Sequence, residues 1–124
     1  MRTWMSLAAV ATGGALGACS RFVLGRAIQG DSSFPRGTLV VNVTGCLAFG
    51  LLAGLLAAHA SEVLKLFVFT GLLGGFTTFS AFGGETVVLL RAQPLRAALY
   101  VGLSVGLGLL AVAAGQGLAG RVRP

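Results

Sequence analysis

The sequence has few charged residues: they make up 10% of its 124 residues, and only three are acidic. It also has one histidine and two cysteines, Cys19 and Cys46, without the spacing of a metal site. So little polar material cannot cover the surface of a water-soluble domain. One histidine and three carboxylates give no constellation of nucleophile, base and orienting group, so we do not expect an enzyme.

Hydrophobic sequence takes the place of the missing charge. Apolar residues make up 56% of the chain, and the mean hydropathy is +0.92. Apolar runs long enough to cross a membrane as helices lie at residues 4–28, 37–58, 64–90 and 97–118. The sequence therefore predicts an all-α membrane protein with one transmembrane domain, residues 1–124. A cleaved signal peptide ending at Cys19 would predict polar residues next, but Phe22, Val23 and Leu24 continue the apolar pattern.

The basic residues outnumber the acidic ones by nine to three, which gives a net charge of +6. They flank apolar runs, so we expect lipid headgroups or a small anion as the partner, and no nucleic acid. On the side of the termini and the middle loop are Arg2, Lys65, Arg121 and Arg123; on the other side are Arg21, Arg26, Arg36, Arg91 and Arg96. This balance favours neither orientation. It predicts insertion both ways and an inverted, dual-topology homodimer.

The stretch from Gly71 to Glu85 differs most from the apolar sequence around it. Two adjacent glycines and two adjacent threonines at Gly74–Thr78 lower its helix propensity. We therefore expect a break in the third transmembrane helix at this point. A break frees backbone carbonyls, which suit a cation, and amide groups, which suit an anion. Such backbone is tolerated in a membrane only where it is buried in protein or lines a cavity.

Isolated polar residues inside the first two runs are candidates for function. Thr38 and Asn42 are four residues apart and share one helical face with Gly45. Two interpretations of Asn42 stay open: an interhelical hydrogen bond, or a donor aimed at a ligand. Arg21 either faces a cavity or extends to the lipid headgroups.

The last two runs carry a second group of candidates. Phe79, Phe82 and either Glu85 or Thr86 lie along one helical face of the third run, at spacings of three and four. Such a phenylalanine pair is ordinarily core packing, although phenyl edges can also face an anion. Tyr100 and Ser104 share one face of the fourth run.

Three sequence blocks carry a family resemblance. They are GGALGACSR at residues 13–21, GTLVVNVTG at residues 37–45 and GLLGGFTTFSAF at residues 71–82. In this order they resemble the Fluc (CrcB-type) fluoride channels over essentially the whole chain. The resemblance implies a dual-topology homodimer with two pores, in the cytoplasmic (inner) membrane of a prokaryote. It also implies passive export of fluoride, with chloride excluded, which lowers the toxicity of fluoride to the cell.

The resemblance also implies roles for single residues. Residues matching the family's anion pathway are Asn42, Phe79, Phe82, Thr38, Ser80, Tyr100, Ser104, Arg21 and Glu85. Backbone carbonyls of Gly74 and Thr77 match those that hold a structural sodium ion at the dimer centre. The chain departs from the family pattern at Ala81, Gly83 and Gly108, where hydroxyl residues are expected.

Two other classes of membrane protein compete with a fluoride channel. Small four-span, dual-topology, proton-coupled exporters of drugs or guanidinium compounds need a carboxylate in the first span, and residues 4–28 contain none. A non-transporting assembly subunit is compatible with the 20 glycines. It gives no reason for Asn42 together with Phe79 and Phe82.

Overall fold

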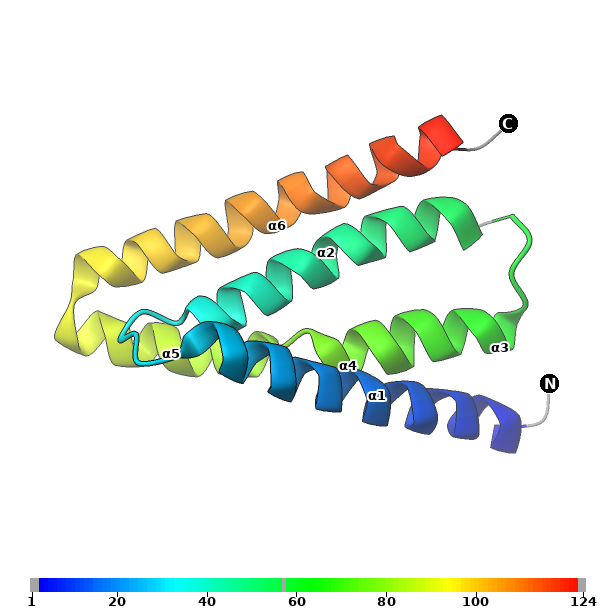
Figure 1. Ribbon diagram of the computed structural model, residues 1–124, viewed down its shortest axis with the longest axis horizontal. Coiled ribbons are helices and arrows are strands. Elements are labelled where there is room, and N and C mark those ends of the chain that lie inside the picture. Colours follow the sequence, from blue (N-terminus) through cyan, green and yellow to red (C-terminus); the bar gives the residue numbers. More distant parts are fainter. Residues whose placement is uncertain (1–2, 57, 123–124) are drawn as a thin grey trace.

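The computed structural model describes residues 3–56 and 58–122, which form helices joined by short connections (Figure 1). The first two spans are α1 (Thr3–Gln29) and α2 (Arg36–Leu56), and the fourth is α6 (Pro94–Val122). The third span consists of α3 (Glu62–Lys65), the π-helix η1 (Leu66–Leu73), α4 (Gly74–Phe76) and α5 (Phe79–Ala92). Arg2 and Arg123, which enter the charge count above, lie outside the described residues.

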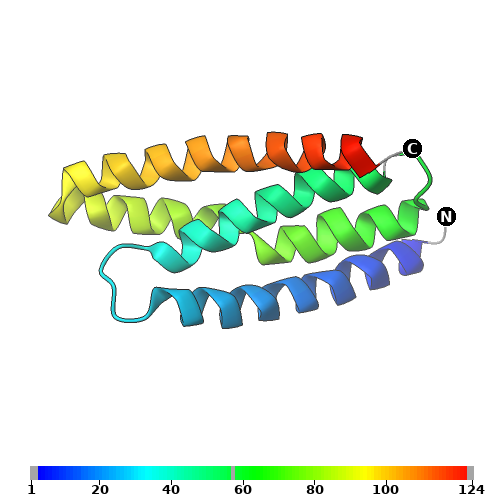
Figure 2. The same cartoon turned by 45° about the horizontal axis from the view of Figure 1, so that its top comes forward.

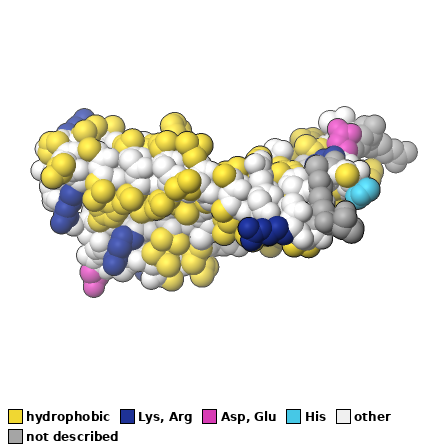
Figure 3. Space-filling view, turned by 90° about the horizontal axis from the view of Figure 1, so that it is seen from above, with side chains coloured by type: hydrophobic (Ala, Val, Ile, Leu, Met, Phe, Trp, Pro, Cys, Tyr) yellow, Lys and Arg dark blue, Asp and Glu magenta, His cyan; other side chains and the backbone are white. Residues whose placement is uncertain are grey.

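Each of these four spans is long and apolar enough to cross a membrane. The prediction of an all-α protein with four membrane-spanning helices is therefore confirmed. Only a small share of each span is buried inside the chain, as expected where apolar side chains face lipid. Hydrophobic side chains cover much of the surface in Figure 3, and Lys and Arg groups lie at its left end and also right of its centre.

The helix ends differ from the predicted ones by a few residues. The second span ends at Leu56, whereas Ala58, its predicted last residue, lies in a turn closed by the Ala60 amide donating to the Leu56 carbonyl (3.2 Å). The fourth span begins at Pro94, earlier than predicted. Proline suits the first position of a helix, where its missing N–H group has no role.

Close packing of backbone joins the first span to the third. The α1 helix lies along the first half of the third span, and α6 lies along α2 (Figures 1 and 2). A Cβ atom at Gly13 would collide with the carbonyl oxygen of Phe67, and one at Gly17 would collide with that of Leu72. The two glycines, four residues apart, thus let α1 approach the third span, as is typical of small residues at membrane helix contacts.

The two ends of the bundle carry different connections. Both ends of the described chain lie near the α2–α3 connection, while the α1–α2 loop and the α5–α6 turn lie together at the opposite end (Figure 2). Arg96, in the first turn of α6, donates to the hydroxyl of Ser33 in the α1–α2 loop at 3.1 Å. This hydrogen bond joins the start of α6 to that loop at the end where the polar residues described next are found.

Candidate functional site

Two residues with extended backbone, Thr77 and Thr78, separate α4 from α5. Thr77 has φ −82° and ψ 157°, and Thr78 has φ −148° and ψ 113°. The residues just before them, Gly74–Phe76, are helical, so the non-helical stretch is shorter than the expected Gly74–Thr78. The Thr77 amide and hydroxyl each donate to the Leu73 carbonyl at 2.9 Å. These bonds close the last turn of the helix in spite of its glycines.

Asn42 on α2 pairs with the backbone at this point. Its Oδ1 accepts a hydrogen bond from the Thr78 amide at 2.8 Å, and its Nδ2 donates to the Thr78 carbonyl at 3.0 Å. Asn42 therefore makes the interhelical bond that was one of its two open interpretations. A carboxamide has two donor hydrogens, and the second has no acceptor among the described residues. The other interpretation, a donor to a ligand, therefore stays compatible with this geometry.

Side-chain acceptors redirect two amide groups at the interruption. In an unbroken α-helix the Thr78 amide would donate to the Gly74 carbonyl, and the Ala81 amide to the Thr77 carbonyl. Here the first donates to Asn42, and the second to the Thr78 hydroxyl at 3.2 Å. The carbonyls of Gly74 and Thr77 therefore lose their regular helical donors. They are two hard oxygen ligands of the kind that bind a small cation.

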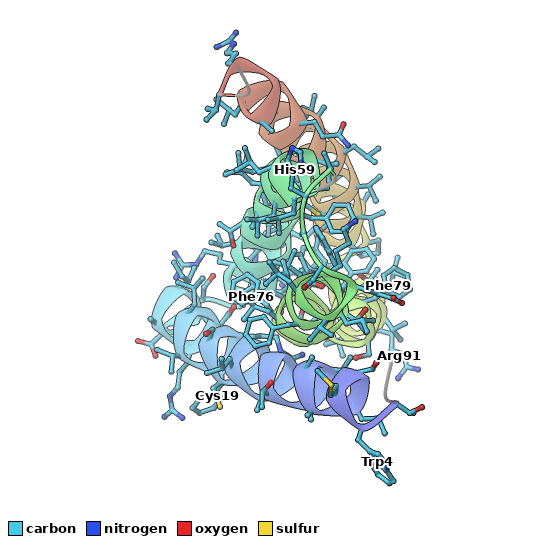
Figure 4. All side chains as sticks on the ribbon, turned by 90° about the vertical axis from the view of Figure 1, so that its right-hand side faces the viewer. Trp4, Cys19, His59, Phe76, Phe79 and Arg91 are labelled. Carbon is cyan, nitrogen blue, oxygen red and sulfur yellow. The ribbon has the colours of Figure 1, made fainter. Side chains whose placement is uncertain are left out.

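Phe79 and Phe82 lie on the first turn of α5, just beyond the interruption. Their ring centroids are 5.6 Å apart, and the Phe82 ring lies 5.3 Å from that of Tyr100. Phe82 is half-buried, whereas Phe79 is 82% exposed. Figure 4 shows Phe79 on the opposite side of the third span from Phe76. Phe79 is therefore not a core residue of this chain, although Phe82 partly is.

A cavity of about 260 Å³ lies beside these rings, and we call it the phenylalanine cavity. Its lining residues come from α2, the interruption, α5 and α6: Asn42, Cys46, Thr77, Thr78, Phe79, Phe82, Ser104 and Val105. The Ser104 hydroxyl oxygen is buried and has no hydrogen-bond partner among the described residues. Buried hydroxyls ordinarily have partners, so this one is available to a ligand.

Glu85, one turn further along α5, accepts two hydrogen bonds from other helices. The Thr38 hydroxyl of α2 donates to Oε1 at 2.7 Å, and the Tyr100 hydroxyl of α6 donates to Oε2 at 2.6 Å. The Tyr100 side chain is fully buried. The three residues, predicted separately as parts of one polar path, thus form one connected group.

Arg21 faces a second cavity, of about 570 Å³, which we call the arginine cavity. Residues of α1, the α1–α2 loop, α2, the interruption and α5 line it: Ala18, Arg21, Phe22, Gly25, Arg26, Gln29, Gly30, Gly37, Thr38, Val41, Thr78, Ala81 and Glu85. Arg21 is half-buried, and Arg26 is exposed with its guanidinium 6.0 Å from the centre of the Phe22 ring. Thr78 lines both cavities, so both border the interruption.

Three further residues complete the comparison with the sequence. Ser80 is exposed, and its hydroxyl lies 3.3 Å from that of Thr78. Cys46 Sγ lies 3.6 Å from the position of a Cβ at Gly108, so a thiol borders the place where a further hydroxyl was expected. Sequence reasoning missed Gln29, which lines the arginine cavity; a glutamine followed by Gly30 at a helix end is the signal that could have found it.

Comparison with known proteins finds a matching family and relatives that align over most of this chain. The family described as "CrcB-like protein, Camphor Resistance (CrcB)" matches residues 8–116. A protein of Paracoccus denitrificans named fluoride-specific ion channel FluC is 51% identical over 111 residues, which cover 86% of this chain and 87% of that protein. Proteins of the same name from Cereibacter sphaeroides and Hyphomonas neptunium are 49% and 47% identical, over 90% and 91% of this chain and 91% and 94% of theirs.

These relatives are named as channels, not as enzymes or drug exporters, and all three are bacterial. The chain also has four membrane-spanning helices. It is therefore a multi-pass membrane protein of a prokaryote, and it belongs to the CrcB-like family.

Proposed function

We propose that this chain forms a passive, fluoride-selective channel in the cytoplasmic (inner) membrane and exports fluoride from the cell. Its bacterial relatives are named fluoride-specific ion channels. The observation that carries the proposal is the phenylalanine cavity, where two phenyl rings, the Asn42 carboxamide and the unpartnered Ser104 hydroxyl meet. Export needs no separate energy source, because a cell that is negative inside drives an anion outward by about 2.3 kcal/mol per 100 mV.

The chemistry of fluoride fits the lining of the phenylalanine cavity. Fluoride is small and strongly hydrated, so a pore must supply donors wherever it removes water. The second amide hydrogen of Asn42 and the Ser104 hydroxyl are such donors. Phenyl edges carry the positive part of the ring quadrupole, so Phe79 and Phe82 can face an anion edge-on. Aliphatic side chains offer neither interaction.

The proposed path begins in the arginine cavity and passes Thr78 to reach the phenylalanine cavity. Arg21, with Arg26 beside it, raises the local concentration of anions at the mouth. Thr38, Tyr100 and Glu85 lie along this path as one hydrogen-bonded group. Exposed Ser80, bonded to Thr78, is the remaining hydroxyl we assign to it.

The working form we propose is an inverted homodimer. The exposed Phe79 ring supports it, because a ring that lines a pore must be covered by something other than this chain. The balanced basic residues support insertion in both orientations. Reporter domains fused to the C-terminus test the topology: both orientations are expected, and finding every copy on one side of the membrane would reject it.

We further propose that the break in the third span binds a structural sodium ion where two inverted copies meet. The Gly74 and Thr77 carbonyls, whose regular helical donors are redirected, would hold it and fit a hard cation. The ion would supply positive potential near the anion path without a titratable group. Replacing sodium by N-methylglucamine should lower the unfolding temperature of the purified dimer. An unchanged temperature would count against the site.

Fluoride efflux from liposomes that contain the purified protein tests the main proposal. Liposomes loaded with potassium fluoride should release fluoride when valinomycin carries the potassium charge. Liposomes loaded with potassium chloride are the matched control and should retain chloride. Fluoride release no faster than from protein-free liposomes would reject the proposed function.

A further inference from the structure

Gln29, the last residue of α1, makes three hydrogen bonds through its side chain. Its Nε2 donates to the carbonyls of Ser32 at 2.6 Å and Phe34 at 3.0 Å, and its Oε1 accepts from the Gly37 amide at 3.0 Å. A carboxamide has only two donor hydrogens, and both are bonded to carbonyls. Gln29 therefore has no donor left for an anion, although it lines the arginine cavity. It acts on the protein backbone.

One of these bonds fixes the start of α2. The Gly37 amide belongs to the first turn of α2, where amide groups have no partner within the helix. Gln29 supplies that partner from α1. The next residue, Thr38, donates to Oε1 of Glu85 at 2.7 Å. The position from which Thr38 reaches Glu85 therefore depends on the Gln29 side chain.

The other two bonds fix the α1–α2 loop. This loop carries Phe34, whose ring meets the Tyr100 ring edge-on with the centroids 5.6 Å apart. Tyr100 is fully buried, and its hydroxyl donates to Oε2 of Glu85 at 2.6 Å. Gln29 thus holds the backbone of Phe34, whose ring covers Tyr100, the second donor to Glu85.

Open space surrounds this loop on two sides. Gln29 and Glu85 both line the arginine cavity, and both also line a neighbouring cavity of about 550 Å³ with Ser33, Pro35 and Leu89. Without the three hydrogen bonds, the loop would still be held by the bond from Arg96 to Ser33 and by the Phe34 ring against Tyr100. Open space in either cavity would then let it shift.

We propose that Gln29 is a positioning residue for the two side chains that donate to Glu85. It positions Thr38 through the start of α2, and it positions Tyr100 through Phe34. One amide side chain thereby controls the geometry of the polar group along the ion path. This inference rests on the proposed function, because its main readout is fluoride flux. Failure of the proposed function would appear as no flux from the unmodified protein, whereas failure of this inference appears only in the variants below.

The first test replaces Gln29 by methionine, which has nearly the same length and shape but none of the three hydrogen bonds. Fluoride flux should fall about tenfold, because a misplaced donor to a carboxylate is equivalent to about one charged hydrogen bond. The matched control is Gln93→Met in the exposed α5–α6 turn, where the glutamine side chain has no hydrogen bond to a described residue. Normal flux in Gln29→Met would overturn the inference.

Measuring the effect of Gln29→Met in two backgrounds separates a positioning role from a general effect on folding. If Gln29 acts through the donors of Glu85, Gln29→Met should lower flux less in a Thr38→Val background than in the unmodified protein. A purely structural role would lower flux by the same factor in both backgrounds. Equal factors would therefore overturn the inference.

A spectroscopic readout needs no flux at all. Tyr100 is the only tyrosine in the chain, so ¹³Cζ-labelled tyrosine gives one NMR signal that reports its hydrogen bond to Glu85. Gln29→Met should shift this signal toward its position in Glu85→Gln, and Gln93→Met should not. Should Gln29→Met fail to fold, Gln29→Glu keeps the acceptor for Gly37 but loses both donors, so it should shift the signal too. An unmoved signal in the folded variant would overturn the inference.

Discussion

The two halves of the third span are held in place by different interactions. The first half, η1 and α4, lies against α1 so closely that a Cβ atom at Gly75 would be 2.6 Å from the carbonyl oxygen of Gly14. The second half, α5, has glycines with no such neighbour, since nothing lies within 4 Å of a Cβ atom at Gly83 or Gly84. Hydrogen bonds hold this half instead. Thr38 of α2 and Tyr100 of α6 donate to Glu85 of α5, and Asn42 of α2 pairs with the adjoining Thr78.

This difference shows how one span can serve two purposes. Lipid gives no hydrophobic force between helices, so close backbone contact and hydrogen bonds must fix their positions. Close contact leaves little space between α1 and the first half, whereas the second half borders cavities lined with hydrogen-bond donors. We therefore expect substitutions in the first half to affect folding and substitutions in the second half to affect flux.

The largest effect on stability is expected for Gly17→Ala, in the contact with the first half. Its new methyl group would collide with the Leu72 carbonyl oxygen, and overpacking of this kind lowers stability by about 3 kcal/mol. Size-exclusion chromatography with heating should show a lower unfolding temperature and less folded protein. Gly84→Ala, in the second half, is the control and should fold normally. An equal drop in unfolding temperature in the two variants would contradict the proposed difference between the two halves of the third span.

The largest effect on flux is expected for Asn42→Asp. A carboxylate cannot donate to the Thr78 carbonyl, and it brings negative charge to the anion path, so fluoride flux should fall about 100-fold or more. Liposome efflux measures this. Thr44→Val is the control, since the Thr44 hydroxyl donates to the Val40 carbonyl of its own helix. Flux at the level of the unmodified protein would remove Asn42 from the path.

Smaller losses are expected for Phe79→Ile and Phe82→Ile. Each removes one phenyl edge from the phenylalanine cavity and should lower fluoride flux about tenfold. Phe79→Ile should leave stability unchanged, because the ring is 82% exposed in the single chain. Phe49→Ile is the matched control, since Phe49 pairs with Phe69 outside this cavity. Unchanged flux in both variants would contradict an aromatic role.

The smallest effect is expected for Tyr100→Phe, which keeps the buried ring and removes one of two donors to Glu85. Flux should fall about fivefold, because Thr38 still donates to the carboxylate. Thr86→Val is the control, since that hydroxyl donates to the Phe82 carbonyl of its own helix. The double variant Thr38→Val with Tyr100→Phe should lose more flux than either single variant. Normal flux in the double variant would separate Glu85 from conduction.

Sequence alone predicted the features that depend on local composition. Apolar run length was enough for the four spans, because membrane thickness sets the length of a helix. Gly13 and Gly17, four residues apart, have the spacing typical of a close helix contact in membranes, and the structure shows such a contact there. The low helix propensity of Gly74–Thr78 predicted a break in the third span. The structure has extended backbone at Thr77 and Thr78 only, and Gly74–Phe76 stays helical, with Thr77 bonded to the Leu73 carbonyl.

The remaining features depend on contacts between segments far apart in the sequence. Nothing in an apolar run predicts the π-helix at Leu66–Leu73, because its wider turn follows from packing and not from residue type. The shared partner of Thr38 and Tyr100 requires three helices at a fixed register. The roles of the anion-path and sodium-site residues stay predictions, since only ion flux and ion binding test them.

The bond between Asn42 and Thr78 has a consequence for what can replace this asparagine. A primary carboxamide carries the same donor and acceptor as a peptide group, so Asn42 meets Thr78 as a residue of a neighbouring β-strand would. One side chain thus makes, inside a helical bundle, the pair of hydrogen bonds that a β-sheet residue makes with its neighbour. Serine and aspartate each lack part of this pairing, and glutamine places it one methylene further out. Position 42 should therefore tolerate variation less than any other polar position of α2.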